Sequence, residues 1–218
     1  MMKIFLVTAN LNEIRKAKAL GLVDGITTNP TLLAREGEKA ETLIRKISEE
    51  VSGPVNVEVT GSTHEEMIKE AEVMAAWGKE IVIKIPINLE GLKVAKMLSS
   101  EGIRTNVTLV FSASQAILAA KAGATYVCPF VGRLDDISFN GLELIRQIRE
   151  IYLNYDEIET KIVVASVRHP IHVIEAGLMG AEIVTIPPAV LEQMSKHPLT
   201  DKGIAQFLED AKKIPTRK

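Results

Sequence analysis

The sequence has a single cysteine and little net charge, and both scarcities exclude functions. Cys128 is the only cysteine among 218 residues, which excludes an internal disulfide and a cysteine-based metal cluster and agrees with a reducing compartment. The formal net charge of −2 offers no general attraction to nucleic acid or to an anionic membrane. Basic residues gather only in the short stretch KKIPTRK. A nucleic-acid-binding role therefore has nothing in its favour.

Long apolar runs and linkers are also missing. The start MMKIFLV lacks the long apolar region and the small-residue cleavage site of a signal peptide. No run approaches the roughly 18 apolar residues of a membrane span. No Gly/Ser-rich linker or low-complexity segment divides the chain, and 46% of its residues are hydrophobic. We expect one cytoplasmic domain over residues 1–218, with no membrane partner.

Eight short runs of β-branched and apolar residues recur along the chain. Segments with helical spacing lie between them, such as 112–123, which Gly123 closes. Strand and helix alternate at intervals of roughly 20 to 30 residues, as in parallel βαβ units. Eight such units predict an α/β fold, a single (β/α)8 TIM barrel. The predicted strands are 3–8, 25–28, 54–60, 81–86, 104–110, 124–130, 161–166 and 182–187.

An open, doubly wound sheet is the competing architecture. It would usually carry a Gly-rich phosphate loop after its first strand, and the stretch VTANLNEI has none. The barrel is therefore favoured. A last helix, predicted over 201–213, is surplus to the barrel.

Lys84 stands in the middle of an otherwise apolar run, KEIVIKIPINLEG. A run that is apolar on both faces is typical of a strand buried on both sides of a parallel sheet. A buried ammonium is costly unless it is paired or gives up its proton. Either the strand is misassigned, or Lys84 is one half of a buried ion pair, or it is a reactive amine.

Other polar residues also stand near predicted strand ends, where barrels carry their chemistry. Asn29 follows Thr28 and precedes Pro30, and an Asn–Pro pair is an ordinary helix start. Glu58 lies among valines, either as a buried partner of Lys84 or as a catalytic carboxylate.

Three further strand ends supply polar candidates. Asn106 and Thr108 share one face of their strand, as a satisfied structural network or as part of a site. Arg133 precedes two aspartates that suit a surface ion pair. Ser166 and Arg168 follow the seventh strand, near where barrels commonly bind phosphate.

The sharpest functional interpretation concerns Lys84. Burial disfavours its charged form, so its amine can attack a ketone and form a Schiff base. Cleavage of the adjacent C–C bond then leaves an enamine. The reaction also needs proton transfer, and Glu58 with Thr108 could hold a water for that purpose. No metal or other cofactor is required, and the four scattered histidines do not suggest a metal site.

Several stretches resemble the short transaldolase family, which includes the fructose 6-phosphate aldolases. The likeness runs over nearly the whole chain, and the combination of TTNP, KIP and NVTLVFS is highly specific. The stretches are GITTNPTLLAREG, VIKIPINLEGLKVAKMLSSEGIRTNVTLVFSASQAILAAKAGATYVCPFVGRLDD and VVASVRHPIHVIEAGLMGAEIVTIP.

The resemblance implies a class I, Schiff-base enzyme of the pentose phosphate pathway. A dihydroxyacetone unit would move from fructose 6-phosphate or sedoheptulose 7-phosphate to an aldose phosphate, such as erythrose 4-phosphate or glyceraldehyde 3-phosphate. Family members of this length are typically decamers of two pentamers, in which the C-terminal helix reaches a neighbour. That arrangement would give the helix at 201–213 its use.

The resemblance also assigns roles to individual residues. Lys84 matches the Schiff-base lysine, and Glu58 and Thr108 match the pair that holds the catalytic water. The candidate substrate contacts are Thr28, Asn29, Asn106, Cys128 and Phe130, and the phosphate grip is Arg133, Ser166 and Arg168.

Two positions distinguish the branches of the family. The aldolase branch carries Tyr where this chain has Phe130 and Gln where it has Glu58, so the chain follows the transferase pattern. A phenyl ring offers no proton to the enamine, which therefore waits for an aldehyde acceptor. An aldolase and a non-catalytic sugar-phosphate-binding barrel stay as alternatives.

Val7 departs from the family pattern. The first strand usually ends in an aspartate, the general acid/base, and this chain reads FLVTAN. Its loss could cost about 10² to 10⁴ in rate, so the activity is expected to be altered or impaired. Neither Asn10 nor Glu13 is an obvious substitute. Val7 is an engineered change, the mark of a natural paralogue, or compensated by a relay through water. Cys128 replaces a usual serine.

Overall fold

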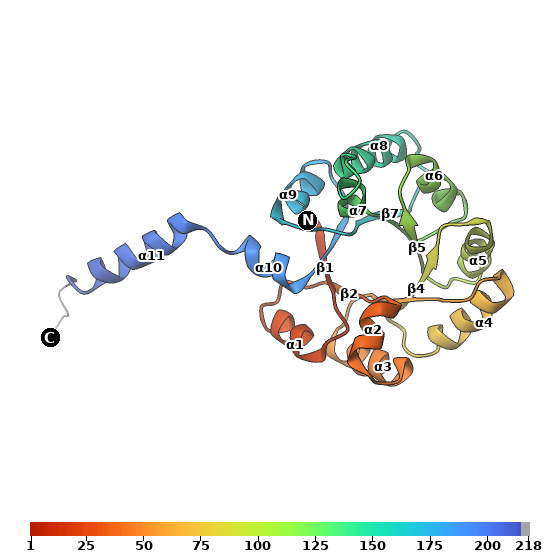
Figure 1. Ribbon diagram of the computed structural model, residues 1–218, viewed down its shortest axis with the longest axis horizontal. Coiled ribbons are helices and arrows are strands. Elements are labelled where there is room, and N and C mark those ends of the chain that lie inside the picture. The colour runs from red at the N-terminus through yellow and green to blue at the C-terminus, as the bar shows by residue number, and fades with distance from the viewer. Residues whose placement is uncertain (215–218) are drawn as a thin grey trace.

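Eight parallel strands close into a barrel, with helices around it (Figure 1). The computed structural model describes residues 1–214. Each strand pairs with the next along the chain, and β1 pairs with β8 to close the ring. The strands are β1 (Lys3–Val7), β2 (Gly25–Thr27), β3 (Val55–Glu58), β4 (Ile81–Pro86), β5 (Thr105–Val110), β6 (Tyr126–Pro129), β7 (Lys161–Val164) and β8 (Ile183–Ile186). The predicted (β/α)8 barrel is confirmed, and each observed strand lies within its predicted range.

Most crossovers contain one helix, but two contain a pair. The crossover from β2 to β3 holds α2 and α3, and that from β6 to β7 holds α7 and α8. The helices are α1 (Leu11–Ala19), α2 (Pro30–Glu36), α3 (Ala40–Glu50), α4 (His64–Ala75), α5 (Leu89–Ser100), α6 (Ala113–Lys121), α7 (Val131–Asp135), α8 (Gly141–Leu153), α9 (Pro170–Leu178), α10 (Pro188–Met194) and α11 (Pro198–Ala211). The short helices α2 and α7 start directly beyond β2 and β6, at the barrel mouth.

The apolar residues form two separate clusters. The larger lies between the barrel and its helices, because alternate strand residues point outward. The smaller fills the barrel interior and consists of Phe5, Val82, Tyr126, Cys128, Phe130, Val163, Ala165 and Ile183. Polar residues at the same level, such as Thr185 beside Phe5 and Asn56 beside Val82, form hydrogen bonds with other parts of the barrel.

Side-chain caps start several helices close to the strand ends. Asn29 accepts a hydrogen bond from the Leu32 N–H at 2.9 Å, with Pro30 in the first turn, so the predicted helix start is confirmed. Such caps hold each loop in a short, defined path. The other residues whose side chains cap a helix N-terminus close to these loops are Asn10, Thr63, Asn88, Ser112 and Asn140.

Strand β5 is irregular near its end. Its register with β6 shifts between Val107 and Val110, and Leu109 takes a left-handed conformation with φ 59°. The extra residue lets Leu109 and Phe111 pack on the inner cluster. The bulge therefore brings Phe111 beside Phe130, with ring centroids 5.6 Å apart.

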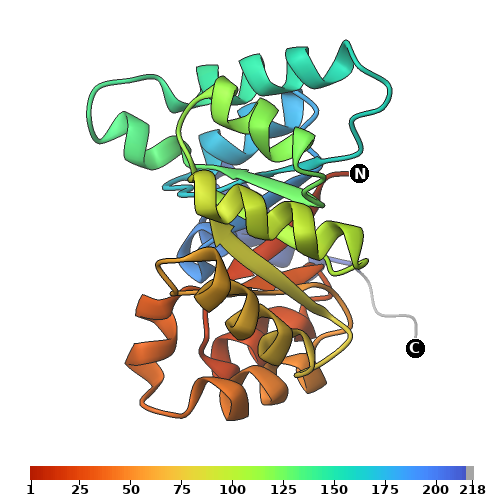
Figure 2. The same cartoon turned by 90° about the vertical axis from the view of Figure 1, so that its right-hand side faces the viewer.

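Helix α11 stands away from the barrel (Figure 1), and the turned view shows it behind the barrel (Figure 2). The predicted C-terminal helix is confirmed, but it covers Pro198–Ala211 rather than 201–213, because His197 caps the helix and Pro198 occupies its first turn. None of its residues is buried in this chain. No helix among residues 1–214 has the length and apolarity needed to cross a membrane.

Candidate active site

Lys84 and Glu58 form a buried ion pair at the ends of adjacent strands. The parallel register of β3 and β4 sets the two residues side by side, and Lys84 Nζ lies 2.7 Å from Glu58 Oε2. Only 5% of the lysine side chain and 14% of the glutamate side chain are exposed. The assignment of the strand is correct, and the carboxylate offsets part of the cost of burying the ammonium. The carboxylate is also placed to accept a proton from the amine.

A chain of asparagines continues the wall beside Lys84. Asn106 is the β5 partner of Lys84, and its Nδ2 donates to Asn56 Oδ1 at 2.8 Å. Asn56 Nδ2 donates in turn to the Ile26 carbonyl at 3.1 Å. These bonds fix the orientation of the Asn106 amide.

Three buried oxygens on β5 have no hydrogen-bond partner within residues 1–214: Thr105 Oγ1, Asn106 Oδ1 and Thr108 Oγ1. Asn106 and Thr108 are fully buried and alternate with Val107, so their oxygens share one face of the strand, opposite to Thr105. Unsatisfied buried oxygens are rare and call for an explanation. Asn106 and Thr108 stand on the strand next to Lys84, so a polar substrate group or a water would satisfy their two oxygens.

The residues at the end of β2 are held by the fold itself. The buried Thr28 hydroxyl donates to the Asn56 carbonyl at 2.7 Å. The Asn29 side-chain oxygen caps α2. Both side chains thus have structural partners already. The Asn29 side-chain NH₂ group can still donate a hydrogen bond to a ligand.

Val7 ends β1 beside Thr27 and shares the inward face of Phe5. The nearby polar residues are engaged elsewhere. Asn10 caps α1 through the Asn12 and Glu13 N–H groups, and Glu13 accepts a hydrogen bond from the Thr8 hydroxyl. The expectation that neither Asn10 nor Glu13 replaces the carboxylate therefore agrees with their contacts.

Cys128 and Phe130 face the barrel interior from β6 and the residue that follows it. Burial raises the pKa of the Cys128 thiol to about 11, opposed by the Lys84 ammonium and by Thr108. The thiol is therefore neutral near pH 7. Phe130 supports the guanidinium of Arg133, which lies 5.1 Å above its ring centroid.

The two predicted phosphate-binding arginines lie on adjacent crossovers. Arg133, on α7, is exposed and has no ion pair within residues 1–214, so the expected contact with Asp135 or Asp136 is absent there. Arg168 pairs with Asp136 instead, at 2.7 Å. Ser166 precedes it with φ 59°. The sequence did not determine which arginine pairs with which aspartate, because Asp135 faces His172 and Asp136 faces Arg168.

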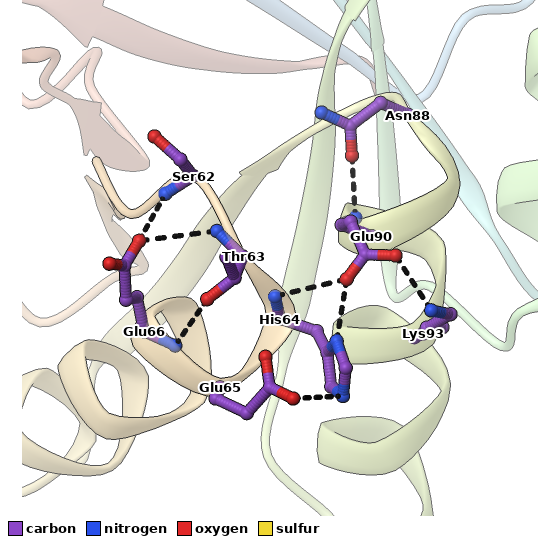
Figure 3. Close-up of polar contacts among 9 residues, drawn as sticks. Ser62, Thr63, His64, Glu65, Glu66, Asn88, Glu90 and Lys93 are labelled. Atoms are coloured by element: carbon purple, nitrogen blue, oxygen red, sulfur yellow. Dashed lines mark hydrogen bonds and ion pairs between the residues drawn. The ribbon is translucent and has the colours of Figure 1, made fainter.

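His64, Glu65 and Glu90 form the one metal-type cluster in the described part of the chain. Figure 3 shows both ring nitrogens of His64 facing carboxylates, Nδ1 to Glu90 at 2.5 Å and Nε2 to Glu65 at 3.1 Å. Hydrogen bonds from Lys93 and His64 lower the pKa of Glu90 to about 2. Each member of the cluster thus has a partner within the protein.

Comparisons with known proteins show the family of the chain. Residues 4–217 match the model of the family described as Transaldolase/Fructose-6-phosphate aldolase. The chain belongs to this family. It is 56% identical to a probable transaldolase of Caldicellulosiruptor saccharolyticus, over 99% of this chain and 100% of the relative. Probable transaldolases of Maridesulfovibrio salexigens (59% identical, over 98% and 99%) and Clostridioides difficile (57% identical, over 96% and 96%) are similar throughout.

Some residues of this transaldolase/aldolase barrel were missed from sequence. Asn56 stands two residues before Glu58, and the alternation in VNVEVT already placed it on the same inward face. Thr185 donates to Thr27 at 2.9 Å across the β1 strand, inside the barrel. No local signal predicts that contact, because it joins residues 158 positions apart.

Proposed function

We propose that the protein is a transaldolase that works through a Schiff base on Lys84. The observation that carries this proposal is the buried Lys84–Glu58 pair beside two of the unsatisfied oxygens on β5. Membership of a family of enzymes that act on sugar phosphates supports it. The donor is fructose 6-phosphate or sedoheptulose 7-phosphate, the acceptor is an aldose phosphate, and the reaction belongs to the pentose phosphate pathway.

The first step joins Lys84 to the ketone. Glu58 accepts a proton from the ammonium, and the neutral amine attacks the C2 carbonyl of the donor. The C2–O bond of the resulting carbinolamine breaks, and a protonated oxygen leaves as water, giving an iminium. Thr108 Oγ1 and Asn106 Oδ1 supply the polar contacts for that water and for a donor hydroxyl.

The second step breaks the C3–C4 bond. A base removes the C4 hydroxyl proton, the electron pair of the bond moves into the iminium, and an aldose phosphate departs. The enamine left on Lys84 then attacks C1 of the acceptor aldehyde, and the base returns its proton to the alkoxide that forms. Water adds to the resulting iminium, and the C2–N bond breaks to free the ketose product and the lysine. Phe130 offers no proton to the enamine, so transfer is favoured over release of free dihydroxyacetone.

Val7 affects the second step. Neither Asn10 nor Glu13 is free to take the C4 proton, so this transfer is slow, while formation of the iminium depends on Lys84 and Glu58. We therefore propose an impaired transaldolase that still forms the iminium on Lys84. Whether the valine is an engineered change or the mark of a natural paralogue does not alter this chemistry.

One assay tests the proposal against its alternatives. Purified protein is incubated with fructose 6-phosphate, with and without erythrose 4-phosphate, and the products are separated. A transaldolase forms sedoheptulose 7-phosphate only when the acceptor is present. Free dihydroxyacetone without acceptor would identify an aldolase instead. Calorimetric binding with neither product would identify a sugar-phosphate-binding barrel.

We also propose that α11 packs on a second copy of the chain, in a homo-oligomer such as a decamer of two pentamers. Its apolar residues Leu199, Ile204, Phe207 and Leu208 are all exposed, Phe207 by 76%. An isolated helix of 14 residues is marginal in water, so it needs a surface to pack against. Sedimentation should show smaller particles for Phe207→Asp than for the control Lys202→Asp; equal masses would contradict the assembly.

A further inference from the structure

His172 is a buried histidine that the proposed reaction does not use. It lies in the first turn of α9, and only 4% of its side chain is exposed. Both ring nitrogens are engaged: Nε2 lies 2.9 Å from Asp135 Oδ2, and Nδ1 accepts from the backbone N–H of Arg168 at 3.2 Å. The ring therefore ties α7 to the loop that follows β7.

These two contacts define the protonation state of the ring. Because Nδ1 accepts a hydrogen bond, the proton of the neutral ring is on Nε2, which donates to Asp135. Burial is the main cause that lowers the pKa of His172, and the neighbouring His169 and Arg168 add to it, while Asp135 opposes them. The surroundings therefore favour the neutral ring with its proton on Nε2 and none on Nδ1.

Asp135 is fixed in turn. Its second oxygen accepts from the Gly141 N–H at 2.9 Å, at the start of α8. The loop after β7 is held from the other side as well, since the Ser166 carbonyl accepts from the Gly132 N–H at 3.0 Å. A side chain at Gly132 would come within 2.1 Å of that carbonyl. The loop and α7 thus form one closely packed unit.

This unit carries the whole predicted phosphate grip. Arg133 is on α7, and Ser166 and Arg168 are on the loop. We propose that His172 and Asp135 are positioning residues for phosphate binding: they fix the backbone at Arg168 so that both arginines meet one phosphate group. This inference rests on the proposed function, because it takes the grip from there.

The adjacent aspartate has the opposite effect. Asp136 pairs with the Arg168 guanidinium itself, and both side chains are more than half exposed, 58% and 53%. A substrate phosphate has to replace this carboxylate at Arg168. Asp135 therefore favours phosphate binding, whereas the adjacent Asp136 competes with it.

The pair of substitutions Asp135→Asn and Asp136→Asn tests the proposal. Asn at 135 can still accept from Gly141, but its NH₂ group faces Nε2 and moves the ring proton to Nδ1, which then cannot accept from Arg168. The measurement is the sugar concentration that half-saturates borohydride trapping on Lys84, compared between fructose 6-phosphate and unphosphorylated fructose. The ratio of the two values isolates phosphate binding from general damage to the barrel.

We expect Asp135→Asn to raise the half-saturating concentration of fructose 6-phosphate about ten-fold and to leave that of fructose unchanged. Asp136→Asn should lower the half-saturating concentration of fructose 6-phosphate by up to about five-fold, because a competing surface ion pair is lost. His172→Asn, whose Oδ1 can replace Nδ1, should keep most of the phosphate preference. His172→Gln, which reaches toward Asp135 only, should lose it.

Three outcomes would overturn the proposal. Equal shifts for the two sugars in Asp135→Asn would mean a general structural role. An unchanged ratio in Asp135→Asn, while the unsubstituted protein prefers the phosphorylated sugar, would reject the positioning role and leave the proposed function intact. No preference in the unsubstituted protein would reject the phosphate grip, and the positioning role with it.

Discussion

The two sides of the barrel mouth differ in how they treat charge. On the β3–β5 side, Lys84 and Glu58 are buried and paired, and the neighbouring Asn106 amide is fixed by hydrogen bonds. On the β6–β7 side, Arg133 and Arg168 are exposed, and Arg168 has only a surface ion pair. The side chains of the β3–β5 side are buried and hydrogen-bonded to one another, whereas those of the β6–β7 side are exposed and the chain there is held mainly by backbone hydrogen bonds.

This difference matches two tasks. Covalent chemistry needs a lysine held in one position beside a proton acceptor, which the buried strand and the Glu58 carboxylate provide. Phosphate recognition needs planar, exposed donors that can exchange partners with water and with carboxylates. We infer that bond formation occurs on the β3–β5 side, and that the β6–β7 side decides which sugars arrive.

Removing the amine should have the largest effect. Lys84→Arg keeps a cation beside Glu58, but a guanidinium does not add to a ketone, so turnover should fall on the order of 10⁴-fold or more. Trapping should be lost with fructose 6-phosphate and with fructose alike. The exposed Lys121→Arg is the control and should retain both. A Lys84→Arg protein that still turns over would place the chemistry elsewhere.

Supplying a carboxylate at the end of β1 should have the next largest effect. Val7→Asp should raise transaldolase turnover by about 10² to 10⁴, with little change in donor binding. Val7→Asn, of similar size but without a carboxylate, is the matched control. Turnover that stays at its starting value in Val7→Asp would reject the role given to this position.

Substitutions on the exposed side should change only phosphate recognition. Arg168→Ala and Arg133→Ala should each raise the half-saturating concentration of fructose 6-phosphate about 10- to 100-fold, because each removes charge-assisted hydrogen bonds. The value for fructose should stay the same, as should trapping at saturation. A comparable loss with fructose would erase the division between the two sides.

The smallest effect concerns pH. Because burial lowers the pKa of His172 below its ordinary value of about 6.5, the unfolded chain binds the proton more tightly than the folded one. Its contribution to the free energy of unfolding is complete above pH 6.5 and is lost as the pH falls toward the folded pKa. Urea unfolding between about pH 7 and 5 should show a shallower loss for His172→Asn. Parallel curves would contradict this.

Periodicity and strand-end placement predicted the barrel and the pairing of Lys84 with Glu58. The strand around Lys84 is apolar on both faces, and parallel register then brings Glu58 beside it. The exposed side was harder, since it depends on which way α7 turns Asp135 and Asp136. His172 gives no sequence signal, because its partners come from two other segments of the chain.

The most direct test of the central claim is borohydride trapping with fructose 6-phosphate, followed by peptide mass spectrometry, on this protein and on Val7→Asp. We predict one reduced adduct, on Lys84 in the VIKIP peptide, in both proteins. That result would make the lysine the reagent and confine Val7 to the later proton transfer. An adduct in Val7→Asp alone would show that the aspartate is needed to form the imine. An adduct on another lysine, or none in either protein, would contradict the account.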